Sequence, residues 1–581
     1  MLRRLQPGTL RLWLGRAALA AGTALVLLLG RAGLWRPFAL AGDAPDDGLT
    51  RVAGVVHVHT TLSDGGGTPE EVITAARRAG LGFVVIADHN HLDAKPLEAY
   101  REGVLTLVGT EISTNAGHVL GLGIPDPVFR FSGDVLDALD DVRALGGFAF
   151  ASHPTSPVAA FRFSGWDLPG PWGLELLNGD SQWRAAGLGR LARTALLYGV
   201  NPGYALLGSL TPPTQALQLW DQLLAQRATP GIVGADAHSR LAIHRQSAVR
   251  FPSYESLFGL ARNHVLLPAP LSGTAGSDAA AVLQALAAGR CYIALDALAP
   301  GGGFFFHVEG GGRRSTMGET LPAGPGLVAR AGGRLPPQAR LVLLRDGRPF
   351  AEGRGVLEAE IRERGVYRVE VRLPRWDVPW ILSNPIYVFD PGTIEQRARR
   401  AAWPAAERAP EPALVLESFE GQPAFHAEFD AASRMEAAIV DRAGAEDGRS
   451  AGRIRFGLGT PGSAGPHVWC ALVDRAERDL SGRRGLVFSI KGDGVYRLWL
   501  QVRDANPASA DEGTEWWFAS VRTSREWRRV AAPFARLRSI DPKSDGRLDL
   551  DRVRALVFVV DEASVKPGSQ GTIWLDEIGV Y

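Results

Sequence analysis

Nine side chains that can bind a metal ion recur near short apolar runs in the first half of the chain. Apolar runs of five to eight residues cover positions 52–58, 83–87, 105–109, 147–151 and 230–235. The candidate ligands at or after such runs are His57, His59, Asp64, His89, Glu111, His118, His153, Asp236 and His238. Because the strand ends of a βα barrel converge on one mouth, side chains placed there meet. The pattern predicts a βα-repeat or barrel fold over 51–298 with one ligand cluster.

Imidazole and carboxylate groups without a thiolate suit zinc, manganese or iron. Cys291 and Cys470 lie far apart, which excludes a disulfide framework and a cysteine-based zinc site. Paired ions can lower the pKa of a shared water and stabilise the attacking and leaving oxygens. A single histidine is more often an ordinary core or surface residue, but nine candidate ligands in one pattern favour a centre of two or three divalent ions.

The motif series resembles the PHP (polymerase and histidinol phosphatase) superfamily. Its members here are H-x-H (57–59), S-D-G (63–65), A-D-H-N (87–90), G-T-E (109–111), G-H-V (117–119), S-H-P (152–154) and D-x-H (236–238). The stretches GTEISTNAGHVLGLG (109–123) and GRCYIALDALAP (289–300) are most similar to the CehA/McbA-type branch. The resemblance implies a distorted (β/α)7 barrel with up to three metals.

The resemblance also implies how the ligands divide among the ions. One ion would be held by His57, His59, Glu111 and Asp236, a second by Glu111, His118 and His153, and a third by Asp64, His89 and His238. Glu111, Asp236 and His238 would be the catalytic residues. Arg240 and His244 are weaker candidates for contact with an anionic substrate.

Three interpretations of function remain open. The first is a metal-dependent hydrolase that activates water against phosphoesters, a PHP-type phosphoesterase. The second is a carbamate or carboxylic ester hydrolase on the same site. The third is an envelope or carbohydrate-binding protein in which metal only stabilises the barrel. The segment 161–214 is either a lid or specificity insert, or a covering helix pair.

Two smaller points near the site also stay open. Asp88 either orients a metal ligand from outside the ligand set or caps a turn. Glu175 and Asn178 end a further apolar run and either reach the mouth or hydrogen-bond the following loop.

The N-terminus is typical of an exported protein. Arg3, Arg4, Arg11 and Arg16 precede the uncharged run 17–30, as in a secretory signal. Ala39-Leu40-Ala41 offers a cleavage site, but it lies far from the apolar run, with Arg31 and Arg36 between them. Residues 1–48 are thus a signal peptide or a membrane anchor plus linker, with residues 12–30 as the anchoring segment. Either leaves the rest of the chain periplasmic or extracytoplasmic.

The second half of the chain is predicted to be β-structure. Residues 301–390 alternate in polarity, with a hairpin signal at Asp346-Gly347, and predict a small β-sandwich. Residues 391–412 are rich in arginine, alanine and proline and indicate a linker. The expected fold class is therefore multidomain: a PHP barrel, a β-sandwich and, over 413–581, a galactose-binding-like β jelly roll.

The 413–581 segment resembles complex I intermediate-associated proteins and family-eleven carbohydrate-binding modules. The matching stretches are LESFEG (416–421), KGDGVYRLWLQVRD (491–504), EWRRVAAPF (526–534) and IWLDEIGVY (573–581). The resemblance raises the prospect of a glycan partner, with Trp499, Trp516 and Trp517 as stacking platforms; the alternative is that they pack against loops. Glu417, Asp576 and Glu577 are either a structural calcium site or ordinary surface carboxylates.

Composition limits the remaining classes. The chain has 581 residues, which predicts three or four domains. Its 46% hydrophobic content excludes a wholly disordered or fibrous protein. With 63 basic and 62 acidic residues the net charge is +1, so no specific nucleic-acid binding is expected.

Overall fold

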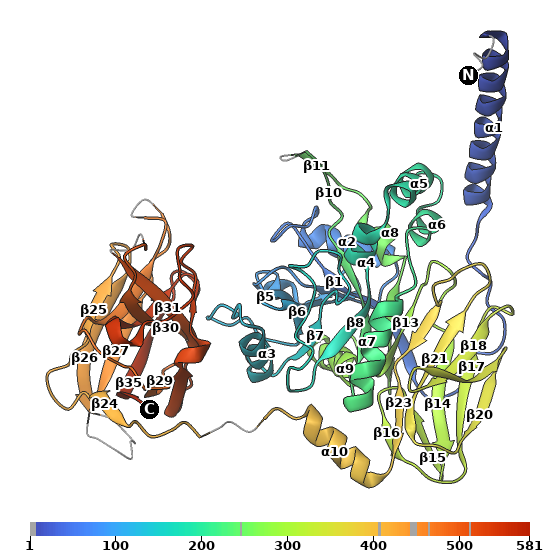
Figure 1. Ribbon diagram of the computed structural model, residues 1–581. Coiled ribbons are helices and arrows are strands. Elements are labelled where there is room, and N and C mark those ends of the chain that lie inside the picture. Colours follow the sequence, from blue (N-terminus) through green and yellow to red (C-terminus); the bar gives the residue numbers. More distant parts are fainter. Residues whose placement is uncertain (1–6, 245–246, 405–407, 442–449, 463–464, 510–512) are drawn as a thin grey trace, which may run out of the picture. The chain divides into compact units, whose positions relative to one another are not determined.

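The computed structural model describes residues 7–581 except 245–246, 405–407, 442–449, 463–464 and 510–512 (Figure 1). The chain divides into two compact units. The first comprises the residues up to Pro125 with Gly133–Pro404, and the second Asp126–Ser132 with Ala405–Tyr581. The prediction of a multidomain, sheet-rich protein is confirmed at this level.

A parallel sheet forms the centre of the first unit. Its strands run in the order β4-β2-β1-β9-β8-β7, each parallel to its neighbours. β6 then pairs antiparallel with β7, and β5 antiparallel with β6. The (β/α)7 barrel is not confirmed, because the six parallel strands are accompanied by the antiparallel β5–β6 hairpin and by the antiparallel partners β3 on β4 and β12 on β1. The bounds are β1 (Thr50–Val58), β2 (Phe83–Ile86), β4 (Val104–Val108), β5 (Thr110–Thr114), β6 (Gly117–Leu122), β7 (Phe148–Ala151), β8 (Gly173–Asn178) and β9 (Gly231–Ala237).

α-Helices follow β1, β6 and β8, a 3₁₀ turn follows β2, and the helix starts are encoded locally. Thr68 and Glu71 form a reciprocal capping box on α2, and Asp134 caps α3. The segment 161–214 contributes three short helices rather than a pair. The helices are α2 (Pro69–Arg78), α3 (Val135–Ala144), α4 (Gly179–Ala185), α5 (Leu188–Tyr198), α6 (Pro202–Leu207), α7 (Thr214–Gln226), α8 (Tyr254–Phe258) and α9 (Ala275–Ala288), with η1 (Lys95–Leu97).

The residues predicted as a separate β-sandwich lie in the same compact unit. β1 pairs with β12, β12 with β13, β13 with β22 and β22 with β21, so one ladder runs from the central sheet into the sandwich. The boundary near residue 300 stays a prediction. The bounds are β3 (Ala99–Arg101), β10 (Leu241–His244), β11 (Ser247–Val249), β12 (Arg262–Leu267), β13 (Cys291–Ala294), β14 (Phe304–Gly310), β15 (Arg313–Thr316), β16 (Thr320–Pro322), β17 (Leu327–Gly333), β18 (Arg340–Arg345), β19 (Arg348–Gly353), β20 (Leu357–Ile361), β21 (Gly365–Arg372), β22 (Ile381–Ser383) and β23 (Ile386–Phe389).

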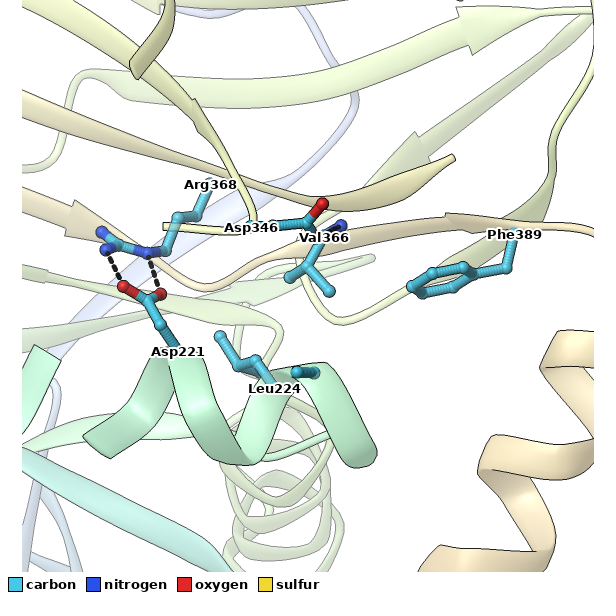
Figure 2. Close-up of a pocket in the computed structure, with 7 residues that line it drawn as sticks. Asp221, Leu224, Asp346, Val366, Arg368 and Phe389 are labelled. Atoms are coloured by element: carbon cyan, nitrogen blue, oxygen red, sulfur yellow. Dashed lines mark hydrogen bonds and ion pairs between the residues drawn. The ribbon is translucent and has the colours of Figure 1, made fainter. Parts of the chain in front are cut away.

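Polar contacts join α7 to the sandwich beside a cavity of about 170 Å³ (Figure 2). The buried Arg368 guanidinium of β21 donates from Nε and Nη2 to the two carboxylate oxygens of Asp221, both at 3.0 Å. Leu224 and Phe389 line the same cavity. A paired, doubly hydrogen-bonded charge such as Arg368 can stay buried, whereas an unpaired one would be costly.

Two further helices lie at the ends of this unit. α1 (Pro7–Leu34) is long and apolar enough to cross a membrane over Arg16–Leu34, with a mean hydropathy of 1.7. Among the described residues no other helix meets this test. α10 (Pro391–Ala401) occupies half of the predicted linker, because Asp390 caps a helix that starts with proline and is rich in arginine and alanine.

The second unit consists of two packed sheets with an apolar core between them. One sheet has the order β26-β27-β35-β29-β32 with β24 on β35, and the other β25-β28-β34-β30-β31-β33. The bounds are β24 (Leu414–Glu417), β25 (His426–Phe429), β26 (Arg434–Asp441), β27 (Ser450–Gly457), β28 (Trp469–Asp474), β29 (Gly485–Gly492), β30 (Arg497–Ala505), β31 (Thr514–Arg522), β32 (Arg528–Pro533), β33 (Arg538–Ser539), β34 (Val553–Asp561) and β35 (Gln570–Val580), with η2 (Phe534–Arg536) and η3 (Leu550–Arg552).

We predict that Asn384→Ala destabilises the central sheet and the sandwich together. The buried Asn384 side chain accepts a hydrogen bond from Gly231 N and donates to Gly231 O and Cys291 O. Its loss leaves these groups unpaired, which should cost about 2–3 kcal/mol of unfolding free energy. Calorimetry should show one first-unit transition shifted down, with the exposed Val356→Ala as a neutral control. A sandwich that melts in its own, unshifted transition would contradict this.

Candidate metal centre

The structure brings all nine predicted ligands into one cluster. His57 and Asp236 are the second-last residues of β1 and β9, and His89 and His153 follow β2 and β7. β6 runs antiparallel, so His118 near its start lies beside the end of β7, where Val119 pairs with Ala151. The cluster contains three groups, and within each group the ligand atoms lie within 4.8 Å of one another. The first group is His57, His59, Glu111 and Asp236, the second is His89, Glu111 and His118, and the third is His59, Asp64, His89 and His238.

Glu111 is the carboxylate at the centre of the cluster. It is 1% exposed, and five imidazoles surround it. Its Oε1 lies 3.0 Å from His118 Nδ1 and 2.7 Å from His153 Nε2. Its Oε2 lies 3.2–3.3 Å from His57 Nε2, His59 Nε2 and His89 Nδ1. One carboxylate thus reaches two sets of nitrogens, which is the arrangement needed to bridge two cations.

Four buried nitrogens in the cluster lack a hydrogen-bond partner among the described residues. They are Nε2 of His57 and His59 and Nδ1 of His89 and His153. The two Nε2 atoms face Glu111 Oε2 and Asp236 Oδ1, the latter at 3.6 and 3.3 Å. A buried polar atom without a partner is unfavourable, and a lone pair aimed at carboxylate oxygens suits a cation. Two imidazoles and two carboxylates fit zinc, manganese or iron.

Glu175, within β8, orients His57 of this group from the side away from Glu111. His57 Nδ1 donates to Glu175 Oε1 at 2.7 Å, which leaves the His57 Nε2 lone pair facing the cluster. Glu175 Oε2 accepts from His153 N at 2.8 Å and from Asn178 Nδ2 at 2.9 Å. A Cβ on Gly234 of β9 would lie 1.8 Å from Glu175 Oε1, so only glycine fits there. Glu175 therefore reaches the mouth of the sheet, where it contacts His57, and its second carboxylate oxygen also accepts a hydrogen bond from the backbone of His153.

Asp88 caps a turn rather than orienting a histidine. Its carboxylate accepts from Thr60 N, Thr60 Oγ1 and Ser63 Oγ. These bonds hold the turn that follows β1 and leads to Asp64. Asp88 thus fixes the backbone on which one predicted ligand is placed.

Three of the predicted ligands have backbone angles in the left-handed region. The φ angles are 69° at His57, 31° at His153 and 47° at Asp236. Such conformations in non-glycine residues cost about 1–3 kcal/mol each and persist where the surroundings enforce them. Here the strained residues are those whose side chains meet at the cluster.

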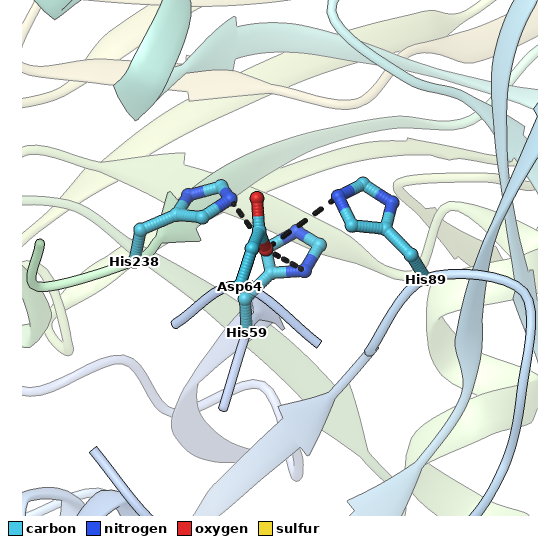
Figure 3. Close-up of side chains that lie close together, drawn as sticks. All are labelled: His59, Asp64, His89 and His238. Atoms are coloured by element: carbon cyan, nitrogen blue, oxygen red, sulfur yellow. Dashed lines mark ion pairs between the residues drawn. The ribbon is translucent and has the colours of Figure 1, made fainter. Parts of the chain in front are cut away.

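The third group is more open to solvent than the first. Its Asp64 Oδ1 lies 3.2 Å from His238 Nε2, 3.6 Å from His89 Nε2 and 3.7 Å from His59 Nδ1 (Figure 3). The Asp64 side chain is half exposed, whereas His57, His59, Glu111 and Asp236 are all buried. This group therefore forms the solvent-facing side of the cluster.

Mutual charge controls the protonation of the cluster. Burial alone would raise the pKa of Glu111, but the surrounding histidines hold it well below its usual range. Burial alone would lower the pKa of His57, but Glu111, Asp236 and Glu175 raise it well above 6.5. Asp64 and Asp236 likewise raise the pKa of His238 to about 9 against its burial. The buried carboxylates thus stay ionised only beside a cation, which protonated imidazole or a metal ion can provide.

A pocket opens beside the third group. It is lined by Asp236, His238 and Arg240 from the cluster side, and by Trp183, Leu206 and Leu210 from the segment 161–214. Phe251, Pro252, Leu257 and Leu260 complete an apolar wall. Arg240 also donates from Nη1 to Asp64 O at 3.2 Å. The other predicted substrate contact, His244, ends β10, and its side chain lies outside the described residues.

The predicted sugar platforms of the second unit lie in different environments. Trp517 is 7% exposed and donates from Nε1 to Asp504, so its ring lies in the core and the prediction for it is wrong. Trp516 carries the Arg503 guanidinium 3.8 Å above its ring. Trp499 is half-buried and donates to Asp561 Oδ1. Trp469, which was not predicted, lines a cleft with Trp516.

The predicted calcium ligands are already engaged. Glu417 accepts from the backbone N–H groups of Phe419 and Ala424. Glu577 pairs with Arg529, and its N–H donates to Asp576 Oδ1. The calcium site stays a prediction.

Comparison with known proteins gives structural neighbours only. No family model matches the chain, and no curated protein matches it. A two-domain protein from Bacteroides vulgatus, described as containing a predicted PHP-like metal-dependent phosphoesterase, is 16% identical with a TM-score of 0.31 and covers 60% of this chain and 99% of its own. A family 11 carbohydrate-binding module from Clostridium thermocellum, in complex with a β-1,3-1,4-mixed-linked tetrasaccharide, is 18% identical with a TM-score of 0.24, covering 30% and 96%. A family 30 module from a Clostridium thermocellum cellulase is 18% identical with a TM-score of 0.19, covering 29% and 94%.

At these TM-scores the likeness carries no conclusion about activity. The CehA/McbA-type branch stays a prediction.

We predict that Glu175→Gln weakens metal binding by about 10–100-fold, the range typical of outer partners of metal ligands. The substitution preserves shape but removes the charge that holds the His57 Nδ1 proton. Titration of the metal-free protein with Mn²⁺ or Zn²⁺ in a calorimeter measures the effect, with the exposed Glu70→Gln as control. Equal affinities for the two variants would show that Glu175 has no part in positioning His57.

Proposed function

We propose that the first unit is a metal-dependent hydrolase whose nine-residue cluster holds two or three divalent cations. The observation that carries the proposal is the buried Glu111 carboxylate, which five imidazoles surround. The Nε2 atoms of His57 and His59 beside it find no hydrogen-bond partner in the part of the chain that the structure describes. When bound, divalent ions would supply Lewis acidity and lower the pKa of a bound water.

The chain's own residues divide the remaining work. Glu111 joins the groups, and Glu175 fixes the ring of His57. Asp236 and His238 line the pocket in which reacting atoms would lie. We therefore propose Glu111, Asp236 and His238 as catalytic residues. Arg240, on the same pocket, provides a cationic contact for an anionic group.

Phosphoesters are the proposed substrate class. The cationic Arg240 beside the cluster supports an anionic substrate, and the wall formed by Trp183, Phe251 and Leu257 supports an apolar leaving group. A carbamate or carboxylic ester with an apolar group would use the same wall, which keeps that alternative open.

We also propose that the protein is exported and keeps α1 as an anchor. The segment around the candidate cleavage site is part of the folded unit: Phe38 N donates to Leu298 O, and Ala41 exchanges two backbone hydrogen bonds with Leu335 at 3.0 and 2.9 Å. Cleavage after Ala41 would leave Phe38 and Ala41 on the fragment that carries α1, so the rest of the chain would lose these backbone hydrogen bonds. The arginines that precede the apolar run favour a cytoplasmic N-terminus and an extracytoplasmic catalytic unit.

A hydrolysis panel tests the function. We expect the Mn²⁺- or Zn²⁺-reconstituted protein to hydrolyse aryl phosphomonoesters or phosphodiesters. Asp236→Asn should lower kcat by about 100-fold or more, beyond the loss typical of outer partners of metal ligands. Asp551→Asn, an exposed aspartate of the second unit, is the matched control.

The panel also contains carbamates and carboxylic esters. Turnover confined to these would replace the phosphoester proposal by its alternative. Absence of all turnover in protein that retains two or more bound metal ions would contradict the hydrolase proposal and favour a metal-stabilised binding protein.

A glycan-binding role for the second unit is a second proposal, supported by a cleft of about 730 Å³ on the β25–β33 sheet. Small residues, Ala471, Ala555 and Val559, form part of its lining, and Trp469 and Trp516 stand beside them. Flat aromatic faces next to hydrogen-bonding side chains such as Gln501 are suited to sugar rings.

We predict that Trp469→Ala weakens binding of a soluble mixed-linkage β-glucan about tenfold, equivalent to about 1.4 kcal/mol. Calorimetric titration measures the dissociation constant. Trp574→Ala is the matched control, because Trp574 is half-buried on β35 of the other sheet. Equal affinity in both variants, or no binding in the wild type, would contradict the glycan proposal.

A further inference from the structure

Helix α5 presents an apolar stripe to solvent. Leu188 is 86% exposed, Leu196 47% and Val200, just beyond the helix, 45%. Thr194 and Leu197, on the opposite face, are buried. Among the exposed positions, Leu188, Ala192, Ala195, Leu196 and Gly199 recur at the spacing of one helix face, and Gly189 and Arg190 are exposed beside them. A helix on the surface of a soluble protein normally has its apolar face inward and its polar face outward, so α5 has an apolar face without a partner in the described chain.

The end of α1 packs against the C-terminal end of α5 and against α6. Ala32 is fully buried against Leu197, Tyr204 and Ala205. Asn201 Nδ2 donates to Ala32 O at 3.2 Å and to Trp35 O at 3.3 Å. A Cβ placed on Gly33 would lie 3.6 Å from Val200 Cγ1, in ordinary contact. The anchor is therefore fixed to the folded unit at α5 and α6, and it meets α5 at the C-terminal end of that helix, next to the exposed Val200.

The side chains around the junction are those of a membrane interface. The Trp35 ring packs against Tyr204 and Trp376, with ring centroids 5.4 and 6.3 Å apart. Arg31, Arg36 and Arg190 are exposed. The sequence from 181 to 220 contains no aspartate or glutamate. Tryptophan and tyrosine concentrate at the level of lipid headgroups, and arginine is attracted to anionic lipid.

We propose that α5 lies in the interface of the bilayer that α1 spans, with its apolar stripe at the boundary of the acyl chains. An amphipathic helix in this position is buried to a depth of about 5–10 Å, with basic residues at the phosphates. The proposal rests on the proposed retention of α1 as an anchor. It commits to lipid as the partner of the stripe, because the stripe continues an apolar helix of membrane-spanning length and its surroundings are cationic and aromatic.

Depth-dependent quenching tests the proposal on the full-length protein in nanodiscs that contain anionic lipid. A single cysteine, labelled with an environment-sensitive fluorophore, replaces Leu196 on the stripe, Leu27 in α1 or Val356 on the β-sandwich, which are 47, 67 and 61% exposed. The native Cys291 and Cys470 are buried, so the label reports the introduced position. Lipids with a nitroxide high on the acyl chain serve as quencher.

The proposal predicts that the Leu196→Cys and Leu27→Cys labels are both quenched and blue-shifted, whereas the Val356→Cys label is not. Quenching at position 27 alone would overturn the proposal while leaving the anchor in place. Energy transfer between Leu196→Cys labels on two molecules, without quenching, would assign the stripe to a second copy of the chain and also overturn it. Quenching at neither position would overturn both the anchor and the α5 interface. None of these readouts uses turnover, so failure of the hydrolase proposal remains separate.

Discussion

The contact between Glu111 and its five histidines is the constraint on which the rest of the first unit depends. A buried carboxylate without a cationic partner is costly, and breaking a buried charge pair by removing one partner typically costs several kcal/mol. Here one carboxylate engages nitrogens from β1, β6 and the segments after β2 and β7. The strand ends must converge for these contacts to form, and the left-handed backbone at His57, His153 and Asp236 is tolerated for the same reason.

The same arrangement places the ligand cluster at the carboxyl ends of the parallel strands and a solvent-accessible pocket beside it. The first group is buried and is braced by Glu175, whereas the third group, with Asp64, is open. The segment between β7 and α7 contributes Trp183 and Leu206 to the pocket and also carries α5. The pocket wall therefore combines this segment with residues 251–260, and the strand ends supply the charged side chains.

Much of the candidate site could be predicted from sequence, because its ligands follow apolar strands in recognisable short motifs. Glu175 could not be assigned, since a glutamate in an apolar run without a motif has the same local pattern as a loop contact. Only the pairing of β8 with β9 shows that Gly234 lies against the Glu175 side chain. Trp516 and Trp517 could not both face a ligand, because neighbouring residues of a strand point to opposite faces. Helix α10 was not predicted, because its N-cap residue Asp390 lies just before the segment 391–412 that was interpreted as a linker.

Metal content tests the central claim most directly. Elemental analysis of the full-length protein after reconstitution and removal of free ions should give two to three equivalents of divalent metal. Glu111→Gln should lose most of that metal, because both groups that meet at this carboxylate lose their shared ligand. A wild-type protein that retains no metal, or a Glu111→Gln variant with unchanged content, would contradict the account.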